Sequence, residues 1–235
     1  MGRGAGFNPG EGSTAAFFID SGELFLIDAG ESVFRTLLER KALDSVSALN
    51  ICITHTHSDH VGSLGSLILY AFMVKKIPVN IIVDDTAAHL SGLRVLFGIY
   101  GLTENMYRFA GAAEFENRYT GFTRLRYVKT VHCNELDSCG LLFETERGMV
   151  FYSGDMRESA PIAEIIAGGQ PIYKIFVDSN NDVTPNIHHI SIHRLNDIIP
   201  AGLKSKVYCM HINNSRCAEE AQAYGFNVVA VNTPS

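Results

Sequence analysis

The densest group of side chains able to do chemistry is the run Thr54–His60, which reads Thr-His-Thr-His-Ser-Asp-His. It follows an apolar segment that is expected to be a strand, and His55 and His57 are two apart, so in extended backbone they point the same way. Asp59 and His60 begin the next element. Imidazole nitrogens and carboxylate oxygens are the ligands that zinc and similar divalent metals take. The run therefore predicts a metal site; the alternative is a polar turn whose histidines only cap and hydrogen-bond.

Three further candidate ligands lie just past expected buried strands: His132 after Leu125–Val131, Asp155 after Met149–Ser153, and His211 after Val207–Met210. Open-sheet folds place their functional residues at such strand ends. Singly, each is as readily a surface or core-edge residue. Together with the histidine-rich run, they predict a site assembled from distant parts of the chain.

The elements that must position these residues alternate in type along the chain. Two apolar runs, Thr14–Asp20 and Glu23–Asp28, predict a β-hairpin, and Ser32 is expected to cap a following helix. Further strands are expected at Ala48–Thr54, Val79–Val83, Leu125–Val131, Gly140–Glu144, Met149–Ser153, Ile175–Asp178, Val207–Met210 and Val228–Val231, with helices at His60–Val74, Ser91–Tyr100, Ile162–Ala167, Arg194–Ile199 and Ala218–Tyr224. This order predicts a layered α/β fold forming a single domain over residues 1–235.

Composition excludes several classes of protein. The chain has 235 residues, 46% hydrophobic and 19% charged, which is enough for a sizeable core and excludes disorder and coiled coil. Its longest apolar run, Leu64–Val74, is too short to cross a bilayer, and no leader pattern opens the chain, so we expect a cytoplasmic protein without membrane contact. Five scattered cysteines predict reduced thiols. A net charge of −6 argues against binding long nucleic acid, and bound cations would supply positive charge locally.

The motif order resembles the metallo-β-lactamase fold, and within it the RNase Z-like phosphodiesterases, from Leu26-Ile27-Asp28-Ala29-Gly30 to His211. The resemblance implies a four-layer αβ/βα sandwich holding two divalent metal ions, for which zinc is expected and manganese is the alternative. It also implies the ligands: His55, His57 and His132 for the first ion, Asp59, His60 and His211 for the second, and Asp155 bridging the two.

A second segment, His189-Ile190-Ser191, resembles the His-Ser-Thr segment of RNase Z enzymes. The resemblance implies that His189 contacts the scissile phosphate and acts in catalysis with Asp59, which orients the nucleophilic water, and that Ser191 binds substrate. His188 is an alternative for the relevant ring. The alternative interpretation is that His188, His189 and His193 are only polar residues at the beginning of a helix.

Within that family, the long Gly/Pro-rich arm of tRNA-processing enzymes has no counterpart here, and Asp178-Ser179-Asn180-Asn181 replaces their His-Glu-Ala-Thr segment. The opening Gly-Arg-Gly-Ala-Gly-Phe-Asn is similar to that of the phage anti-Pycsar proteins. This similarity implies a homodimeric phosphodiesterase that counters antiphage signalling by hydrolysing 3′,5′-cyclic nucleotides, namely cyclic CMP and UMP and also cyclic AMP and GMP, to nucleoside monophosphates in the bacterial or infected-host cytoplasm.

Other functions share these motifs. The alternatives are an RNase Z-like endonuclease acting on RNA 3′ ends, another hydrolase of the same fold such as a lactonase, and a metal-loaded module that sequesters nucleotides without turnover. The aromatic segment Tyr100–Phe122 also has two interpretations: a lid or dimer surface on which a base stacks, or core packing beneath a covering helix.

Overall fold

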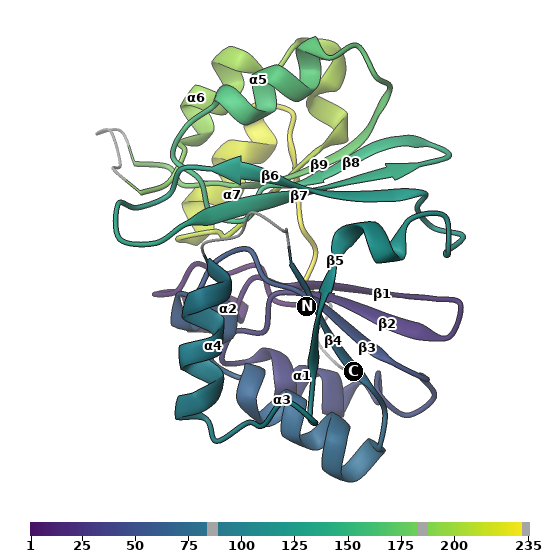
Figure 1. Cartoon of the computed structure of the whole chain (residues 1–235). Coiled ribbons are helices and arrows are strands. Elements are labelled where there is room, and N and C mark those ends of the chain that lie inside the picture. The colour runs from purple at the N-terminus through teal and green to yellow at the C-terminus, as the bar shows by residue number, and fades with distance from the viewer. Residues whose placement is uncertain (84–88, 183–187, 232–235) are drawn as a thin grey trace.

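Two β-sheets lie face to face in the computed structural model, which describes residues 1–83, 89–182 and 188–231, and helices cover the outer face of each sheet (Figure 1). The first sheet contains β1 (Ala16–Asp20), β2 (Glu23–Ile27), β3 (Leu49–Cys52), β4 (Val79–Val83) and β5 (Arg108–Gly111). The second contains β6 (Arg124–Thr130), β7 (Ser138–Thr145), β8 (Gly148–Tyr152), β9 (Ile172–Asp178), β10 (Val207–Met210) and β11 (Asn227–Val228). The implied four-layer αβ/βα sandwich is confirmed.

Strand direction determines where the chain leaves each sheet. In the first sheet, β2 to β5 run parallel and only β1 is antiparallel to its neighbour. In the second, β8 to β11 run parallel, and β6 has the same direction as β8 because two antiparallel pairings separate them. The segments that follow β3, β6, β8, β9 and β10 therefore leave the carboxyl ends of parallel strands, where open sheets gather functional side chains.

Alternating side chains connect the layers. In β2, Leu24 and Leu26 face the outer core of the first sheet, whereas Phe25 and Ile27 face the core between the sheets. The first sheet is covered by α1 (Val33–Glu39), α3 (Leu64–Tyr70) and α4 (His89–Ile99), and the second by α5 (Ala160–Ala167), α6 (Ile192–Ile198) and α7 (Ser215–Ala223). Each sheet thus buries both faces, which explains its long apolar runs.

The end of the aromatic segment is core. Phe115, Tyr119 and Phe122 lie between the two sheets, and Phe25 meets the Tyr119 ring edge-on at a centroid distance of 4.7 Å. The earlier Tyr100, Tyr107 and Phe109 are partly buried against the outer core of the first sheet. The packing interpretation is therefore the correct one for these rings.

Three elements of the structure differ from the sequence-based expectation. The helix expected at His60–Val74 is divided into α2 (Ser58–Val61), α3 and a π-helical turn (Ala71–Lys75), because the Ser63 amide donates to Ala29 O at 2.9 Å instead of continuing the helix. β5 was not expected, since its four residues lie within the irregular aromatic segment Tyr100–Phe122. The last strand pairs only at β11, shorter than the expected Val228–Val231.

Within the described residues, no helix combines the length and apolarity that crossing a bilayer requires.

Asp20 offers a test of how the hairpin joins the aromatic segment. Its carboxylate is buried and accepts hydrogen bonds from the Thr120 amide and hydroxyl (3.2 and 2.9 Å) and from the Gly121 amide. Burial raises the pKa of Asp20, but these hydrogen bonds outweigh it and hold the pKa below its ordinary value. The ionised carboxylate therefore stabilises the folded state above about pH 4, and this contribution is lost as the pH falls.

We expect Asp20→Ala to lower the free energy of unfolding by about 1–3 kcal/mol at pH 7, measured by urea denaturation, with the deficit shrinking toward pH 3. Asp197→Ala, which removes an exposed carboxylate, is the control and should change little at either pH. A deficit for Asp20→Ala that is independent of pH would contradict the assignment.

Candidate dinuclear metal centre

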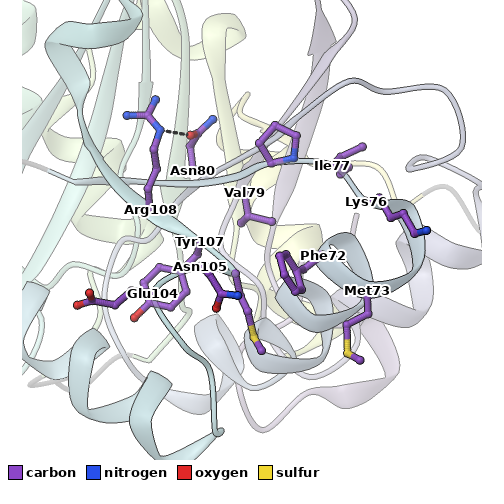
Figure 2. A pocket seen from close by; sticks show the side chains of 12 residues that line it. Phe72, Met73, Lys76, Ile77, Val79, Asn80, Glu104, Asn105, Tyr107 and Arg108 are labelled. Carbon is purple, nitrogen blue, oxygen red and sulfur yellow. Dashed lines mark hydrogen bonds between the residues drawn. The ribbon is translucent and has the colours of Figure 1, made fainter.

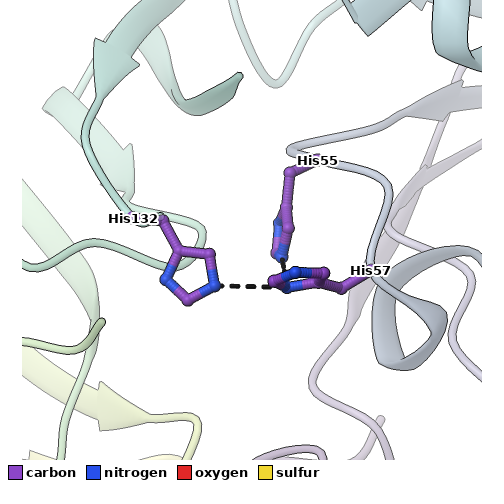
Figure 3. A group of neighbouring side chains, drawn as sticks. All are labelled: His55, His57 and His132. Carbon is purple, nitrogen blue, oxygen red and sulfur yellow. Dashed lines mark hydrogen bonds between the residues drawn. The ribbon is translucent and has the colours of Figure 1, made fainter. Parts of the chain in front are cut away.

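Three histidine rings converge at the junction of the two sheets. His55 and His57 follow β3, and His132 follows β6 in the opposite sheet (Figure 3). His57 Nδ1 lies 3.0 Å from His55 Nε2 and 3.2 Å from His132 Nε2. Zn–N bonds of 2.0–2.1 Å in a tetrahedral site place ligand nitrogens roughly 3.3 Å apart. The spacing of these three nitrogens therefore fits a single divalent metal ion.

A second group lies beside the first and contains two carboxylates. His211 Nε2 is 3.2 Å from Asp59 Oδ2 and 3.3 Å from Asp155 Oδ2. His60 Nε2 is 3.5 Å from Asp59 Oδ2 and 3.3 Å from Asp155 Oδ1. The four ligand atoms lie within 4.8 Å of one another, so this group also fits one ion.

Asp155 lies between the two groups. Its Oδ2 atom is 3.8 Å from His55 Nε2 and 3.7 Å from His132 Nε2, in addition to its short contacts with His60 and His211. The residue is only 2% exposed. This buried carboxylate is thus placed to contact an ion in either group, which supports the bridging role implied by the sequence.

Two atoms of the second group lack partners that a buried polar atom needs. Among the described residues, His60 Nε2 and Asp155 Oδ1 are buried without a hydrogen bond. Leaving such groups unpaired costs free energy, and a coordinated cation would satisfy both. The donor set, the spacing and these unpaired atoms together fit divalent metal binding.

A surrounding layer of hydrogen bonds orients the rings. His60 Nδ1 is 2.8 Å from Asp28 Oδ2, His132 Nδ1 is 2.8 Å from the His188 carbonyl, and His55 Nδ1 is 3.2 Å from Thr54 Oγ1. When Nδ1 carries the proton, Nε2 presents its lone pair to the metal. Asp28 belongs to a motif of the resemblance but had no predicted role, and in the structure its carboxylate orients the His60 ring.

Backbone strain occurs at two of these positions. Asp28 and His211 have left-handed φ angles of 63° and 56°. Asp28 is fixed there by the amide and hydroxyl of Thr54, each 2.8 Å from a carboxylate oxygen. Non-glycine residues in this region are uncommon and concentrate at functional sites.

His189 lies against both groups, and its contact with the scissile phosphate stays a prediction. Its ring is 4.8 Å from the His132 ring and 4.9 Å from the His211 ring, measured between centroids, and its Nδ1 lies 2.8 Å from Asp178 Oδ2. Burial lowers the pKa of His189, but the Asp178 carboxylate outweighs this effect and the pKa is raised above its ordinary value. His189 is therefore disposed to carry a proton.

Asp178 is the residue that sequence analysis missed. It is fully buried, contacts His189 and also lies 3.4 Å, through Oδ1, from His211 Nδ1. In the sequence, Asp178 stands out only because its segment differs from the His-Glu-Ala-Thr segment of the tRNA-processing enzymes. The available signal was its position at the end of an expected strand, the same signal that identified Asp155.

Other histidine-segment residues do not join the groups. Ser191 Oγ accepts the Arg194 amide at 3.2 Å and caps α6, and no contact with the candidate ligands is described for it. His193 Nδ1 lies 2.9 Å from the Tyr224 hydroxyl, where α6 meets α7. His188 contributes its backbone carbonyl to His132. Substrate binding by Ser191 stays a prediction.

The chain matches one known family over almost its whole length. The family model described as "Anti-Pycsar protein Apyc1" matches residues 1–232. The chain belongs to the anti-Pycsar Apyc1 family. No curated protein sequence matches significantly. Family and ligand groups together identify this Apyc1-family chain as a metal-dependent hydrolase.

Solved structures share the fold of the Apyc1-family chain at low sequence identity. The metallo-β-lactamase fold protein YhfI from Bacillus subtilis has a TM-score of 0.71 and 17% identity, covering 97% of this chain and 92% of its own. A diphosphatase from the PhnP family has a TM-score of 0.65 and 19% sequence identity, and the match covers 92% of this chain and 81% of the diphosphatase. The short form of human tRNase Z has a TM-score of 0.64 and 15% sequence identity, and the match covers 97% of this chain and 94% of the tRNase Z chain. These likenesses confirm the metallo-β-lactamase fold.

Two cavities of the Apyc1-family chain lie away from the metal centre. One of about 750 Å³ is at the amino end of β4, where Arg108 donates to Asn80 (Figure 2). Another of about 750 Å³ lies between the edge strand β1 and the β7–β8 hairpin. Of the candidate ligands, Asp59 lines only a smaller hollow of about 270 Å³ beside the N-terminal loop. The chemistry of the ligand groups, not cavity size, identifies the site.

Protons hold the two groups together when no metal is bound. Burial lowers the pKa of His211, but the Asp155 and Asp178 carboxylates outweigh it and raise the pKa to about 10. Burial raises the pKa of Asp155, yet the charges on His211 and His60 hold it well below its usual range. Metal ions and protons therefore compete for the same atoms.

Metal binding should stabilise the folded Apyc1-family chain. At a free zinc or manganese concentration 100 times the dissociation constant, we expect an increase of about 2.7 kcal/mol in the free energy of unfolding, measured as a rise in Tm that a chelator reverses. Asp155→Ala should lose this rise, whereas Glu158→Ala, an exposed acid three residues away, should keep it. An unchanged rise in Asp155→Ala would contradict the bridging role.

Proposed function

We propose that this hydrolase is a dinuclear metal phosphodiesterase that converts 3′,5′-cyclic nucleotides, including cyclic CMP and UMP and also cyclic AMP and GMP, to nucleoside monophosphates, and so counters Pycsar-type antiphage signalling. The observation that carries the proposal is the Asp155 carboxylate lying between two ligand groups in a chain of the anti-Pycsar family. We propose zinc as the metal, with manganese as the alternative, and the ligands His55, His57, Asp59, His60, His132, Asp155 and His211.

Charge balance favours an anionic substrate at this position. The ligand carboxylates are Asp59 and Asp155, so two divalent cations would bring more positive charge than these two ligands neutralise, in a chain whose net charge is −6. A small phosphodiester matches that local field without the extended basic surface that long nucleic acid needs. This supports a cyclic mononucleotide over an RNA chain.

Divalent cations bound in such a centre lower the pKa of water toward 7 and stabilise negative charge on a phosphoryl group. The protein must orient the water that attacks phosphorus. Burial raises the pKa of Asp59, but the hydrogen bond from His211 and the charge on the nearby His60 ring hold it well below its usual range, so the carboxylate stays ionised. Its side chain keeps 16% exposure, and it is placed to accept a hydrogen bond from that water.

His189 can act on the other side of the reaction. With Nδ1 directed to Asp178, the protonated ring would donate its Nε2–H to a phosphoryl oxygen of the bound substrate, where negative charge develops as water adds. One ester P–O bond then breaks, and the same proton can pass to the departing ribose oxygen. The attacking water supplies the proton that restores His189, so protons balance over the cycle.

We also propose that the chain acts as a homodimer and as one domain, in the cytoplasm. Val95 and Ile99, four residues apart on α4, are 66% and 75% exposed, which supports an additional contact surface there. Light scattering coupled to size exclusion would measure the mass in solution.

Product analysis tests the proposed activity. Purified protein loaded with manganese or zinc should release linear monophosphate from a panel of 3′,5′-cyclic nucleotides, and Asp155→Ala should release none. Cleavage of RNA oligonucleotides alone would favour the endonuclease alternative. Recovery of every cyclic nucleotide unchanged would eliminate the phosphodiesterase proposal and favour sequestration.

His189→Ala should lower kcat for cyclic nucleotides by about 10²- to 10⁴-fold while leaving bound metal unchanged, because general acid catalysis contributes that much. Bound metal is measured by elemental analysis. His193→Ala is the matched control, since His193 contacts Tyr224 away from the centre, and it should retain full activity.

Asp178→Asn should reduce kcat in the same direction as His189→Ala, because the ring loses its charged partner. Full activity of His189→Ala on cyclic nucleotides would contradict the proton-donor role of His189. Absence of cyclic-nucleotide turnover, with activity on an ester or lactone that survives His189→Ala, would favour the ester or lactone hydrolase.

A further inference from the structure

Phe7 is the only exposed aromatic side chain among the residues whose burial the structure describes. Its relative exposure is 104%, so its ring contacts almost nothing in the chain. A single exposed apolar residue requires no explanation by itself. The position of Phe7 beside the metal centre is what makes it informative.

The residue before Phe7 lies against a candidate metal ligand. A Cβ atom placed on Gly6 would lie 2.9 Å from Asp59 Oδ2 and 3.1 Å from Asp59 Cγ. The absence of a side chain at Gly6 therefore allows the backbone to approach this carboxylate closely. Phe7 is the next residue along the chain after this close approach to Asp59.

The loop that carries Phe7 is fixed to the chain just after another candidate ligand, His211. Ile212 donates its amide to Arg3 O at 2.7 Å, and its carbonyl accepts the Ala5 amide at 3.1 Å and Asn8 Nδ2 at 2.9 Å. Hydrogen bonds on both sides of Phe7 thus hold the loop in place while leaving its ring in solvent. The hollow beside Asp59 continues beneath this loop.

We propose that the Phe7 ring is a specificity-determining contact on which the nucleobase of the substrate stacks while the phosphate occupies the metal centre. This inference rests on the proposed function. Base–aromatic stacking contributes about 1–3 kcal/mol per base and accepts purines and pyrimidines alike, as a panel of cyclic nucleotides requires. The aromatic segment Tyr100–Phe122, the other source of rings, is packed into the protein core at Phe115, Tyr119 and Phe122.

Kinetics with and without a nucleobase test this contact. Phe7→Ala should raise KM for cyclic nucleotides by about tenfold with little change in kcat, because stacking stabilises the bound substrate and the transition state equally. Phe7→Tyr should restore KM. Base-free ribose 3′,5′-cyclic phosphate should be hydrolysed equally by wild type and Phe7→Ala. Ile19→Ala, which removes an exposed apolar side chain at β1, is the control and should match wild type.

A binding measurement provides a second readout, because the chain contains no tryptophan. Phe7→Trp should create a single fluorophore whose emission is quenched by a slowly hydrolysed phosphorothioate analogue of a cyclic nucleotide and not by base-free ribose cyclic phosphate. Ile19→Trp should show no quenching with either compound.

The outcomes separate this inference from the proposed function. If wild type hydrolyses cyclic nucleotides and Phe7→Ala has an unchanged KM, the stacking contact is wrong and the proposed function stands. If Phe7→Ala impairs the base-free ester equally, the loop rather than the ring is responsible, which also overturns the contact. If wild type turns over no cyclic nucleotide and Phe7→Trp is not quenched, both proposals fail.

Discussion

The structure depends on a buried negative charge, the Asp155 carboxylate, which lies among histidines from both halves of the sandwich. An isolated carboxylate in this environment would be very unfavourable, so it must be matched by cations, whether protons on His60 and His211 or bound metal ions. The surrounding side chains follow from that requirement. Five histidine rings point a nitrogen inward. Those whose other nitrogen faces Asp28, Thr54 or a carbonyl are fixed in orientation by it.

The two sheets contribute unequal parts of the centre. The first sheet and its following turn supply His55, His57, Asp59 and His60, whereas the second supplies His132, Asp155 and His211. Neither ligand group is complete within one sheet, because His132 joins the first group and His211 and Asp155 join the second. The apolar layer between the sheets, with Phe25 against Tyr119 and Phe122, therefore sets the relative position of the ligands even though none of these rings touches one.

The layered α/β fold was predictable from the order of expected strands and helices, and the seven candidate ligands could be proposed because they form local patterns. Apolar strands followed by His or Asp can be recognised residue by residue, and the spacing of His55 and His57 already predicts a shared direction. Asp178 also stands at the end of an expected strand, but its contact with His189, eleven residues away, is a tertiary one that no spacing indicates. The division of the expected His60–Val74 helix was also invisible, since it results from the hydrogen bond between Ser63 and Ala29, 34 residues apart in sequence.

The left-handed backbone at Asp28 and His211 narrows which residues evolution can place there. Most side chains would meet a conformational penalty at these positions before any effect on coordination, whereas asparagine tolerates the same backbone at little cost. Position 28 can therefore lose its charge by drifting to asparagine without losing its shape. No such replacement is open to position 211, because glycine and asparagine, which tolerate its backbone conformation, cannot replace an imidazole ligand. In related chains the left-handed backbone at this position should therefore persist only together with the histidine.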